Sequence, residues 1–381
     1  MNQTSKNIMI IAGEASGDMH GADLLKELKE LNPALNFFGI GGDKMKAEGQ
    51  VADYHINQMA FLGFVEVIKH IPFIKKVQKS LIERIEKENI KEIILIDYPG
   101  FNLNFAKKIK KLGVKIYYYI SPQIWAWGQH RIKKIQRLVD KMLVLFPFEK
   151  DFYTEHNVDC SYVGHPLSEQ IGTYKFLEKE ELFEKLNLDR SKEILLFLPG
   201  SRKQEIENLF SVCLPAAEKL CKKHNLQLVV ACSQNIEESH FDSYKKEFSF
   251  TVVKHHTYDL YKHSKFGIIK SGTSTLEAGF IQLPFVIVYS TNWLTYQIGK
   301  MLIKIDSIGL INIVAGKKII TELIQSDVNT NKIFSSVETY LSDEKKYSVL
   351  KDQLSIIKTK LGNEEASKNA ASIICSELND N

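Results

Sequence analysis

Three short Gly/Ser segments in this chain follow apolar runs and precede helical patterns. They comprise residues 12–18 (AGEASGD), 199–202 (PGSR) and 271–274 (SGTS). Turns of this kind point unpaired backbone N–H groups and the positive end of a helix at whatever lies above the strand. Such turns favour phosphate or carboxylate ligands. The pattern therefore indicates a substrate that is phosphorylated or activated by a nucleotide.

Asp97 is the clearest candidate for acid–base chemistry. It follows the apolar run 93–96, and ligands of open α/β sheets bind at the carboxyl ends of the strands. A carboxylate in such a crevice can take a proton from an attacking sugar hydroxyl. Alternatively, Asp97 is only a turn residue before Pro99, with Asn102 as the N-cap of the next helix. Position alone does not choose between these interpretations.

Arg202 and Glu277 are candidates for nucleotide binding. The planar guanidinium of Arg202 can hold a diphosphate through two hydrogen bonds, and Glu277 can accept hydrogen bonds from ribose hydroxyls. Both loops also fit ordinary helix starts, because Ser201 with Gln204, and Ser274 with Glu277, have capping-box spacing. Taken together at matching strand ends, the two loops favour a nucleotide site.

Several classes of function are disfavoured. Residues 39–42 (GIGG) lack the spacing and the downstream acid of a dinucleotide fingerprint, so NAD is not expected. No Asp-x-Asp motif is present, and the five cysteines are scattered without CxxC spacing. We therefore predict no metal and no cofactor, and a reducing compartment.

Two kinds of segment remain open to more than one interpretation. Residues 121–127 (SPQIWAW) hold two of the three tryptophans, which suits either stacking on a sugar ring or a packed aromatic core. The apolar runs 61–74 and 293–303, bordered by lysines, suit either buried core or contact with anionic lipid. Lys and Arg also cluster at 69–91, 107–115 and 131–141, either as solvated helix faces or facing an anionic partner.

The chain as a whole predicts two α/β domains. With 381 residues it is longer than one core usually supports. Strand-like and helical patterns alternate in both halves, which indicates parallel sheets with crossover helices. We expect domains at 1–170 and 171–345, with helices at 346–381 that pack back on the first. The polar N-terminus and the lack of a long apolar run predict no signal peptide and no membrane span.

The order of the motifs resembles that of the lipid-A-disaccharide synthases. The matching segments span nearly the whole chain, and AGEASGD and SPQIWAW are the most specific of them: 12–18, 39–42, 121–127, 146–149, 163–166, 198–202 and 271–277. The resemblance implies an inverting glycosyltransferase with a GT-B fold, in which two Rossmann-like domains face a cleft. It also implies a cytoplasmic enzyme held peripherally at the inner face of a bacterial inner membrane, and gives no oligomeric state.

The implied reaction transfers 2,3-diacylglucosamine from UDP to the 6-hydroxyl of 2,3-diacylglucosamine 1-phosphate. Its products are the β-1,6-linked disaccharide 1-phosphate and UDP. The implied partners are therefore these two glycolipids and an anionic membrane surface, with no nucleic acid. Asp97 is the general base that the resemblance implies.

The resemblance also assigns roles to other residues. Those expected to bind the UDP-sugar are Gly200, Ser201, Arg202, Gly272, Thr273, Ser274, Glu277, Asn312, Glu322 and Gln325. Those expected to line the acceptor side are Glu14, Ser16, Asp18, Asn102, Ser121, Gln123 and Trp125. Those expected to contact membrane or acyl chains are Phe61, Phe64, Ile68, Phe73, Lys75, Lys76, Trp293, Lys300 and Lys304.

The chain departs from the family pattern at two positions. The family usually has Asp where Gly100 stands and Arg where Gly128 stands, and His130 or Arg131 is placed to replace the missing arginine. Two alternatives therefore stay open. One is another UDP-sugar glycosyltransferase or epimerase of the same fold, and the other is a non-catalytic relative that binds a UDP-sugar or a lipid.

Overall fold

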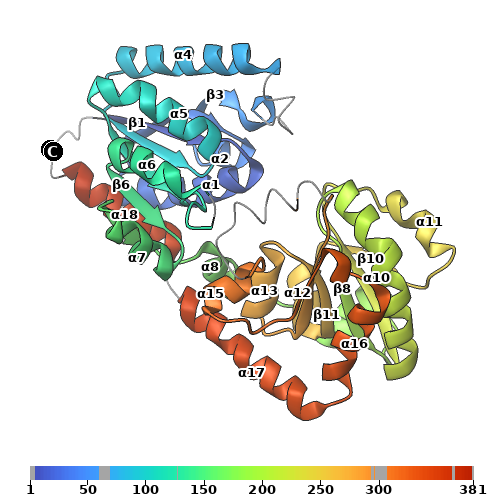
Figure 1. The fold of residues 1–381 in the computed structure, drawn as a ribbon. Coiled ribbons are helices and arrows are strands. Elements are labelled where there is room, and N and C mark those ends of the chain that lie inside the picture. The colour runs from blue at the N-terminus through green and yellow to red at the C-terminus, as the bar shows by residue number, and fades with distance from the viewer. Residues whose placement is uncertain are drawn as a thin grey trace. The chain divides into compact units, whose positions relative to one another are not determined.

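The computed structural model describes residues 5–59, 69–126, 128–292, 296, 307–362 and 365–379. The chain divides into two compact units. The first comprises Met1–Glu169 and Asn363–Asn381, and the second comprises Gln170–Gly362. Each unit is a parallel β-sheet with helices packed on it (Figure 1).

The first unit is built on a parallel sheet in the order β3-β2-β1-β4-β5-β6-β7. Its strands are β1 (Lys6–Ala12), β2 (Leu35–Gly41), β3 (Val51–His55), β4 (Glu92–Ile96), β5 (Lys115–Tyr119), β6 (Lys141–Val144) and β7 (Cys160–Tyr162). The order reverses direction between β1 and β4. In a doubly wound sheet this switch point opens a crevice at the carboxyl ends of the strands.

Helices cover the first sheet, and the last helix of the chain is one of them. They are α1 (Ala15–Leu31), α2 (Asp43–Ala47), α4 (Ile71–Lys87), α5 (Pro99–Ile109), α6 (Ile132–Leu138), α7 (Pro147–Glu155), α8 (Pro166–Thr173, which crosses the unit boundary) and α18 (Ala366–Asn379). Helix α18 packs against α1. Lys115 of β5 holds it through an ion pair with Glu377 at 2.7 Å.

The second unit repeats the plan with the sheet order β10-β9-β8-β11-β12-β13. Its strands are β8 (Glu193–Leu198), β9 (Leu226–Cys232), β10 (Thr251–Lys254), β11 (Ser264–Lys270), β12 (Phe285–Tyr289) and β13 (Glu322–Ile324). Its helices are α9 (Lys179–Lys185), α10 (Lys203–His224), α11 (Asp242–Lys245), α12 (Thr257–His263), α13 (Ser274–Phe280), α15 (Leu310–Ala315), α16 (Thr330–Leu341) and α17 (Glu344–Leu361). The switch point of this sheet lies between β8 and β11.

The central strands are buried on both faces, which explains why the sequence shows apolar runs rather than alternation. Every residue of β4 is buried. The single acid in that strand, Glu92, pairs with Lys6 of the neighbouring β1 at 2.9 Å. Burial of both faces fixes the register of the central strands, and with it the positions of the loops that follow them.

Three alternative interpretations of local structure are wrong. Asn102 lies inside α5, and Tyr98 is the N-cap residue of that helix. The N-caps of α10 and α13 are Arg202 and Thr273, and neither makes a side-chain capping bond. The capping-box interpretation of both Gly/Ser loops therefore fails. In α10, Glu205 instead accepts the hydrogen bond from the Ser201 N–H, which leaves the Ser201 hydroxyl out of the helix start.

None of the helices within the described residues has the length and apolarity needed to cross a bilayer.

Candidate active site

Asp97 lies in a strained turn between β4 and α5, at the switch point of the first sheet. Both Asp97 and Tyr98 have left-handed backbone conformations, with φ of 42° and 46°. Left-handed conformations are unfavourable for residues other than glycine, and they persist only where surrounding contacts hold them. Strain of this kind at a strand end is typical of functional sites.

Buried polar groups hold the backbone of Asp97. Its N–H donates to the Tyr119 carbonyl at 3.0 Å. Its carbonyl accepts hydrogen bonds from the Tyr118 hydroxyl at 2.6 Å and from the Asn102 side-chain amide at 2.7 Å. The backbone is therefore fixed from two sides. Asn102, predicted on the acceptor side, acts here as a buried support for the turn.

The surroundings of Asp97 raise the pKa of its carboxyl group. Burial and the nearby negative charge of Glu14 raise its pKa to about 6, although a hydrogen bond from the Tyr98 backbone opposes this. A base with a pKa just below neutrality is ionised near pH 7 and still accepts a proton readily. Glu14 and Ser16, both predicted on the acceptor side, are exposed: Glu14 lies in the loop after β1 and is the N-cap residue of α1, and Ser16 lies in the first turn of that helix.

Tyr98 closes this turn against two other loops. Its hydroxyl donates to the Met59 carbonyl at 3.0 Å. A Cβ atom at Gly13 would overlap the Tyr98 ring, so glycine is required at the end of β1. The loops after β1 and β4 therefore pack closely against each other beside Asp97.

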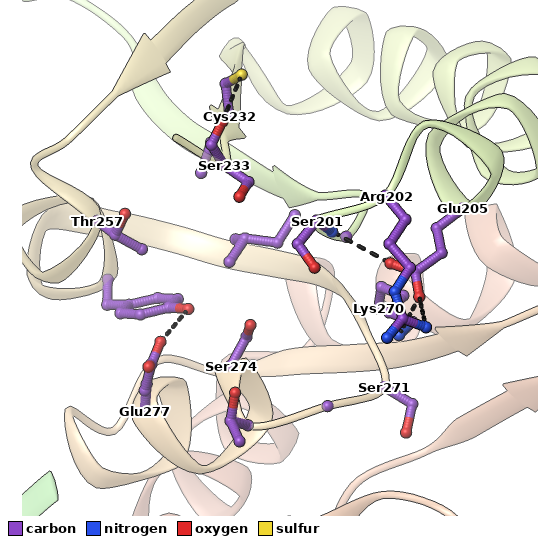
Figure 2. Close-up of a pocket in the computed structure, with 16 residues that line it drawn as sticks. Ser201, Arg202, Glu205, Cys232, Ser233, Thr257, Lys270, Ser271, Ser274 and Glu277 are labelled. Atoms are coloured by element: carbon purple, nitrogen blue, oxygen red, sulfur yellow. Dashed lines mark hydrogen bonds and ion pairs between the residues drawn. The ribbon is translucent and has the colours of Figure 1, made fainter. Parts of the chain in front are cut away.

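A cavity of about 370 Å³ opens at the switch point of the second sheet, and we call it the second-unit cavity (Figure 2). The ends of β8 and β11 and the loops that follow them form much of its wall. Most of the residues predicted to bind the UDP-sugar line it: Gly200, Ser201, Arg202, Gly272, Thr273, Ser274 and Glu277. Gly200 has a φ of +115°, which a residue with a side chain adopts only with strain.

Arg202, Glu205 and Lys270 form a charged cluster at one side of this cavity (Figure 2). Lys270 Nζ lies 2.8 Å from Glu205 Oε1, and Arg202 Nη1 lies 3.9 Å from the same oxygen. Burial alone would raise the pKa of Glu205, but Lys270, the Ser201 N–H and Arg202 outweigh it and lower the pKa. One carboxylate thus partly neutralises two cations, and an entering diphosphate would compete for both.

Glu277 lies on another wall of the same cavity, away from the charged cluster (Figure 2). Its carboxylate accepts a hydrogen bond from the Tyr261 hydroxyl at 3.1 Å. Burial raises the pKa of Glu277, and the Tyr261 hydrogen bond opposes this rise. The cavity therefore offers cations at one side and a hydrogen-bond acceptor at another, as a nucleotide's diphosphate and ribose require.

Three residues predicted to bind the UDP-sugar do not line the second-unit cavity. Asn312 is buried and donates to Glu322 at 2.8 Å, and Glu322 accepts the backbone N–H of Gly309 at 2.9 Å. Gln325 exchanges two hydrogen bonds with the backbone of Thr291. These contacts tie β13 to its neighbouring loops, so in this structure the three side chains support the fold.

Asp18, also predicted on the acceptor side, is buried and serves the start of α2. Its carboxylate accepts hydrogen bonds from the backbone N–H groups of Gly42 at 2.6 Å, Lys44 at 3.2 Å and Met45 at 3.1 Å. This binds the AGEASGD segment to the GIGG segment. The hydrogen bonds of Asp18 therefore give the AGEASGD and GIGG segments a structural role, because they join the two loops.

Glu149 holds the SPQIWAW loop in place through hydrogen bonds. It is buried in α7 and accepts hydrogen bonds from the Ser121 hydroxyl at 2.7 Å and the Trp125 indole at 3.0 Å. Burial raises the pKa of Glu149 to about 7, against the effect of these bonds. Trp125 is only 8% exposed, and its ring meets Phe148 edge-on, whereas Gln123 is exposed. Within the described loop, the core interpretation of Trp125 is therefore the better one.

A groove of about 940 Å³ runs between α4 and α5, which lie along the same side of the first unit (Figure 1). Its apolar lining includes Ile71, Ile74, Ile82, Phe101 and Leu112, and its lysines are Lys75, Lys107, Lys108 and Lys111. We call it the apolar groove.

The residues predicted to contact membrane or acyl chains lie partly at this groove and partly outside the described residues. Lys75 lines the groove, Lys76 is exposed beside it, and Phe73 packs edge-on against Tyr54. The others lie outside the described residues: Phe61, Phe64, Ile68, Trp293, Lys300 and Lys304.

Several residues with clear roles are not among the predicted site residues. Lys270 and Glu205 complete the charged cluster, Tyr261 holds Glu277, and Glu149 holds the SPQIWAW loop. Lys270 is the last residue of β11, so its strand-end position is a usable signal. Tyr261 and Glu277 are 16 residues apart, so no local pattern pairs them. Glu149 lies in the matching segment 146–149, and Glu205 has local partners in Ser201 and Arg202, so both carry a signal in the sequence. Among the described residues, no group of three His, Cys, Asp or Glu side chains is placed to hold a metal ion.

Solved structures of similar fold identify the fold class of the chain. The UDP-GlcNAc 2-epimerase from Neisseria meningitidis bound to UDP-GlcNAc matches with a TM-score of 0.65 and 13% identity, covering 98% of this chain and 100% of that chain. A calicheamicin glycosyltransferase matches with a TM-score of 0.62 and 12% identity, covering 100% and 99%. The chain thus has the GT-B fold, with a cavity suited to a nucleotide at the switch point of its second unit.

The family follows from the sequence. The family model described as Lipid-A-disaccharide synthetase matches residues 8–377. The lipid-A-disaccharide synthases of Geobacter sulfurreducens and Geobacter metallireducens are each 39% identical to this chain, over 378 and 377 residues, and each match covers 98% of both chains. The chain belongs to the lipid-A-disaccharide synthase family and is a glycosyltransferase of lipid A biosynthesis. The predicted family and fold are confirmed.

Proposed function

We propose that this enzyme transfers 2,3-diacylglucosamine from UDP to the 6-hydroxyl of 2,3-diacylglucosamine 1-phosphate. The products are the β-1,6-linked disaccharide 1-phosphate and UDP. Membership of the family supports the reaction class. The observation that carries the chemistry is the position of Asp97, a carboxylate with a raised pKa in a strained turn at the switch point of the first sheet.

Asp97 serves as the general base in this proposal. Its carboxylate takes the proton of the acceptor 6-hydroxyl while that oxygen attacks C1 of the donor sugar. The new C1–O bond forms as the bond from C1 to the UDP oxygen breaks, and UDP leaves with the electron pair. Attack opposite the leaving group inverts the configuration at C1, so a single base suffices.

The second-unit cavity holds UDP in this proposal. Arg202 and Lys270 are the cations that take the diphosphate, and they stabilise the negative charge that grows as UDP departs. Gly200 and Gly272 allow the backbone to approach the phosphates closely, and Glu277 accepts the ribose hydroxyls. Glu205 keeps Arg202 and Lys270 in position until the diphosphate enters.

The apolar groove between α4 and α5 supports a role in binding acyl chains. A groove that is apolar inside and bordered by lysines matches a fatty acyl chain beside an anionic head group. Ile71 is 40% exposed at the start of α4, so the apolar lining of the groove continues onto the solvent-exposed surface. We infer that the same face holds the enzyme peripherally on an anionic membrane at the cytoplasmic side.

The test is the product of the wild-type enzyme with both purified glycolipids. We expect UDP release that depends on the acceptor and a disaccharide whose new linkage is β-1,6 by NMR. Arg202→Ala should raise the KM for the donor by about tenfold, because it removes a charge-assisted hydrogen bond. Lys203→Ala is the matched control, since Lys203 is an exposed neighbour that does not line the second-unit cavity.

Other products would overturn the proposal. Donor epimerised at C2 without transfer would make the protein an epimerase, in line with the solved structures that share its fold. Binding of UDP without any release from the donor would make it a non-catalytic binding protein.

A further inference from the structure

A second cavity in the first unit lies beside the start of α5. It has a volume of about 330 Å³, and its wall includes Gly100, Asn104, Arg131 and Lys134. We call it the basic cavity. Gly100 is in the first turn of α5, which follows directly on the strained turn of Asp97. The wall of the basic cavity therefore begins at Pro99, which follows the turn of the proposed base in sequence.

Local contacts hold the polar wall of this cavity in place. Lys134 Nζ donates to Asn104 Oδ1 at 3.1 Å, and Asn104 Nδ2 donates to the Gly100 carbonyl at 2.9 Å. Gly128 has a φ of +78° and starts the short turn that carries Arg131, whose N–H donates to the Gly128 carbonyl at 2.9 Å. Loop and helix thus present an arginine and a lysine to the same cavity.

The cavity carries an excess of positive charge. Burial lowers the pKa of Lys134, and the nearby charges of Lys107 and Arg131 lower it further. No acidic side chain is among the described residues that line the basic cavity. A bound anion would relieve this repulsion, so charge complementarity favours an anionic occupant.

The occupant must also fit the surroundings of the cavity. The basic cavity and the apolar groove share Gly100 and Asn104 in their walls, so the two spaces adjoin. A single molecule that carries both a phosphate and acyl chains matches both spaces. Free phosphate or a nucleotide matches only the basic cavity.

We propose that the basic cavity binds the phosphate of the phosphorylated acceptor, with Arg131 and Lys134 as its ligands. The inference rests on the proposed function and names a subsite for one of its substrates. Arg131 offers a planar fork suited to two phosphate oxygens, and Lys134 offers a point charge. Fixing the phosphate here restricts how the acceptor sugar reaches Asp97, so the cavity selects the phosphorylated acceptor.

The test compares two acceptors, 2,3-diacylglucosamine 1-phosphate and the same glycolipid without phosphate. Lys134→Gln and Arg131→Gln should each lower kcat/KM for the phosphorylated acceptor roughly tenfold or more, because each removes a charge-assisted hydrogen bond. Neither should change kcat/KM for the acceptor without phosphate, or UDP affinity, by more than about twofold. Lys134→Arg should retain the preference for phosphate.

Lys133→Gln is the matched control. Lys133 lies beside Lys134 on α6 and is exposed, and it does not line the basic cavity. One contrary result is that Lys133→Gln and Lys134→Gln lower kcat/KM for the phosphorylated acceptor equally and also weaken binding to phosphatidylglycerol vesicles in sedimentation. That result would overturn the subsite in favour of general attraction to a membrane. Equal losses for both acceptors in Lys134→Gln would also overturn it.

Failure of the proposed function is distinguishable from failure of this inference. If the wild-type enzyme transfers to neither acceptor, equilibrium titration with 2,3-diacylglucosamine 1-phosphate in detergent micelles still measures the subsite. Weaker binding in Lys134→Gln than in Lys133→Gln supports the subsite, and equal binding overturns it.

Discussion

Asp97 combines an unfavourable backbone conformation with an unfavourable charge. Its φ of 42° is held by Tyr118 and Asn102, and its carboxylate is partly removed from water near Glu14. Both features cost stability, and a sequence selected for stability alone would avoid them. Their presence at one residue, at the end of a central strand, is the physical argument for function.

The raised pKa of Asp97 predicts how stability depends on pH. The folded pKa of about 6 exceeds the ordinary value of 3.8, so the folded state binds this proton more tightly than the unfolded state. Its stabilising contribution is complete below pH 3.8 and is lost as pH rises through about 6. Asp97→Asn should therefore raise the free energy of unfolding at pH 8 by up to about 3 kcal/mol and have a much smaller effect near pH 4.

Urea unfolding at the two pH values measures this difference. Asp151→Asn is the control, because Asp151 is an exposed aspartate of the same unit. A gain in Asp97→Asn that is equal at both pH values would contradict the assignment, since it would then reflect backbone strain and not charge.

At the scale of elements, one buried acid links α7 to the SPQIWAW loop. Besides Ser121 and Trp125, Glu149 accepts hydrogen bonds from the backbone N–H groups of Leu145 at 3.2 Å and Phe146 at 3.1 Å. All of these partners are donors, so the site requires an acceptor at both oxygens. This explains a fully buried acid that has no cation among its hydrogen-bond partners.

Glu149→Gln should therefore destabilise the protein. The new amide would place its own N–H groups against backbone donors, so one or two buried donors would lose their partner. We expect the free energy of unfolding to fall by about 1–3 kcal/mol. Glu155→Gln is the matched control, because Glu155 is exposed on the same helix. Urea unfolding followed by tryptophan fluorescence gives both values, and equal midpoints would show that Glu149 is not needed as an acceptor.

The central strands and the two Gly/Ser loops of the second unit follow from the sequence because burial on both faces leaves a clear pattern. The short edge strands β3 and β13 do not, since neither carries a long apolar run. The helix starts differ from the local alternatives because the side chains bond to other nearby backbone groups: Asn102 donates to the carbonyls of Ile96 and Asp97, which precede α5. Lys270 and Glu205 lie far apart in sequence, so only the fold pairs them.

At the scale of the whole molecule, the two units repeat one plan with different chemistry. Each parallel sheet reverses its order beside its first strand, between β1 and β4 in the first unit and between β8 and β11 in the second, and each places polar groups at that point. The first unit carries the proposed base and the basic cavity, and the second carries a cavity with two cations and a hydrogen-bond acceptor. The proposed reaction between a nucleotide-activated sugar and a phosphorylated lipid would use both sets of groups.

We assign the base to the first unit and UDP binding to the second. The most direct test measures both the turnover of Asp97→Asn and its affinity for UDP. General base catalysis typically contributes about 100- to 10,000-fold, so kcat should fall by a factor in that range. The affinity for UDP should stay within about twofold of the wild type, because UDP is assigned to the other unit. Turnover near the wild-type rate, or a parallel loss of UDP binding, would contradict the account.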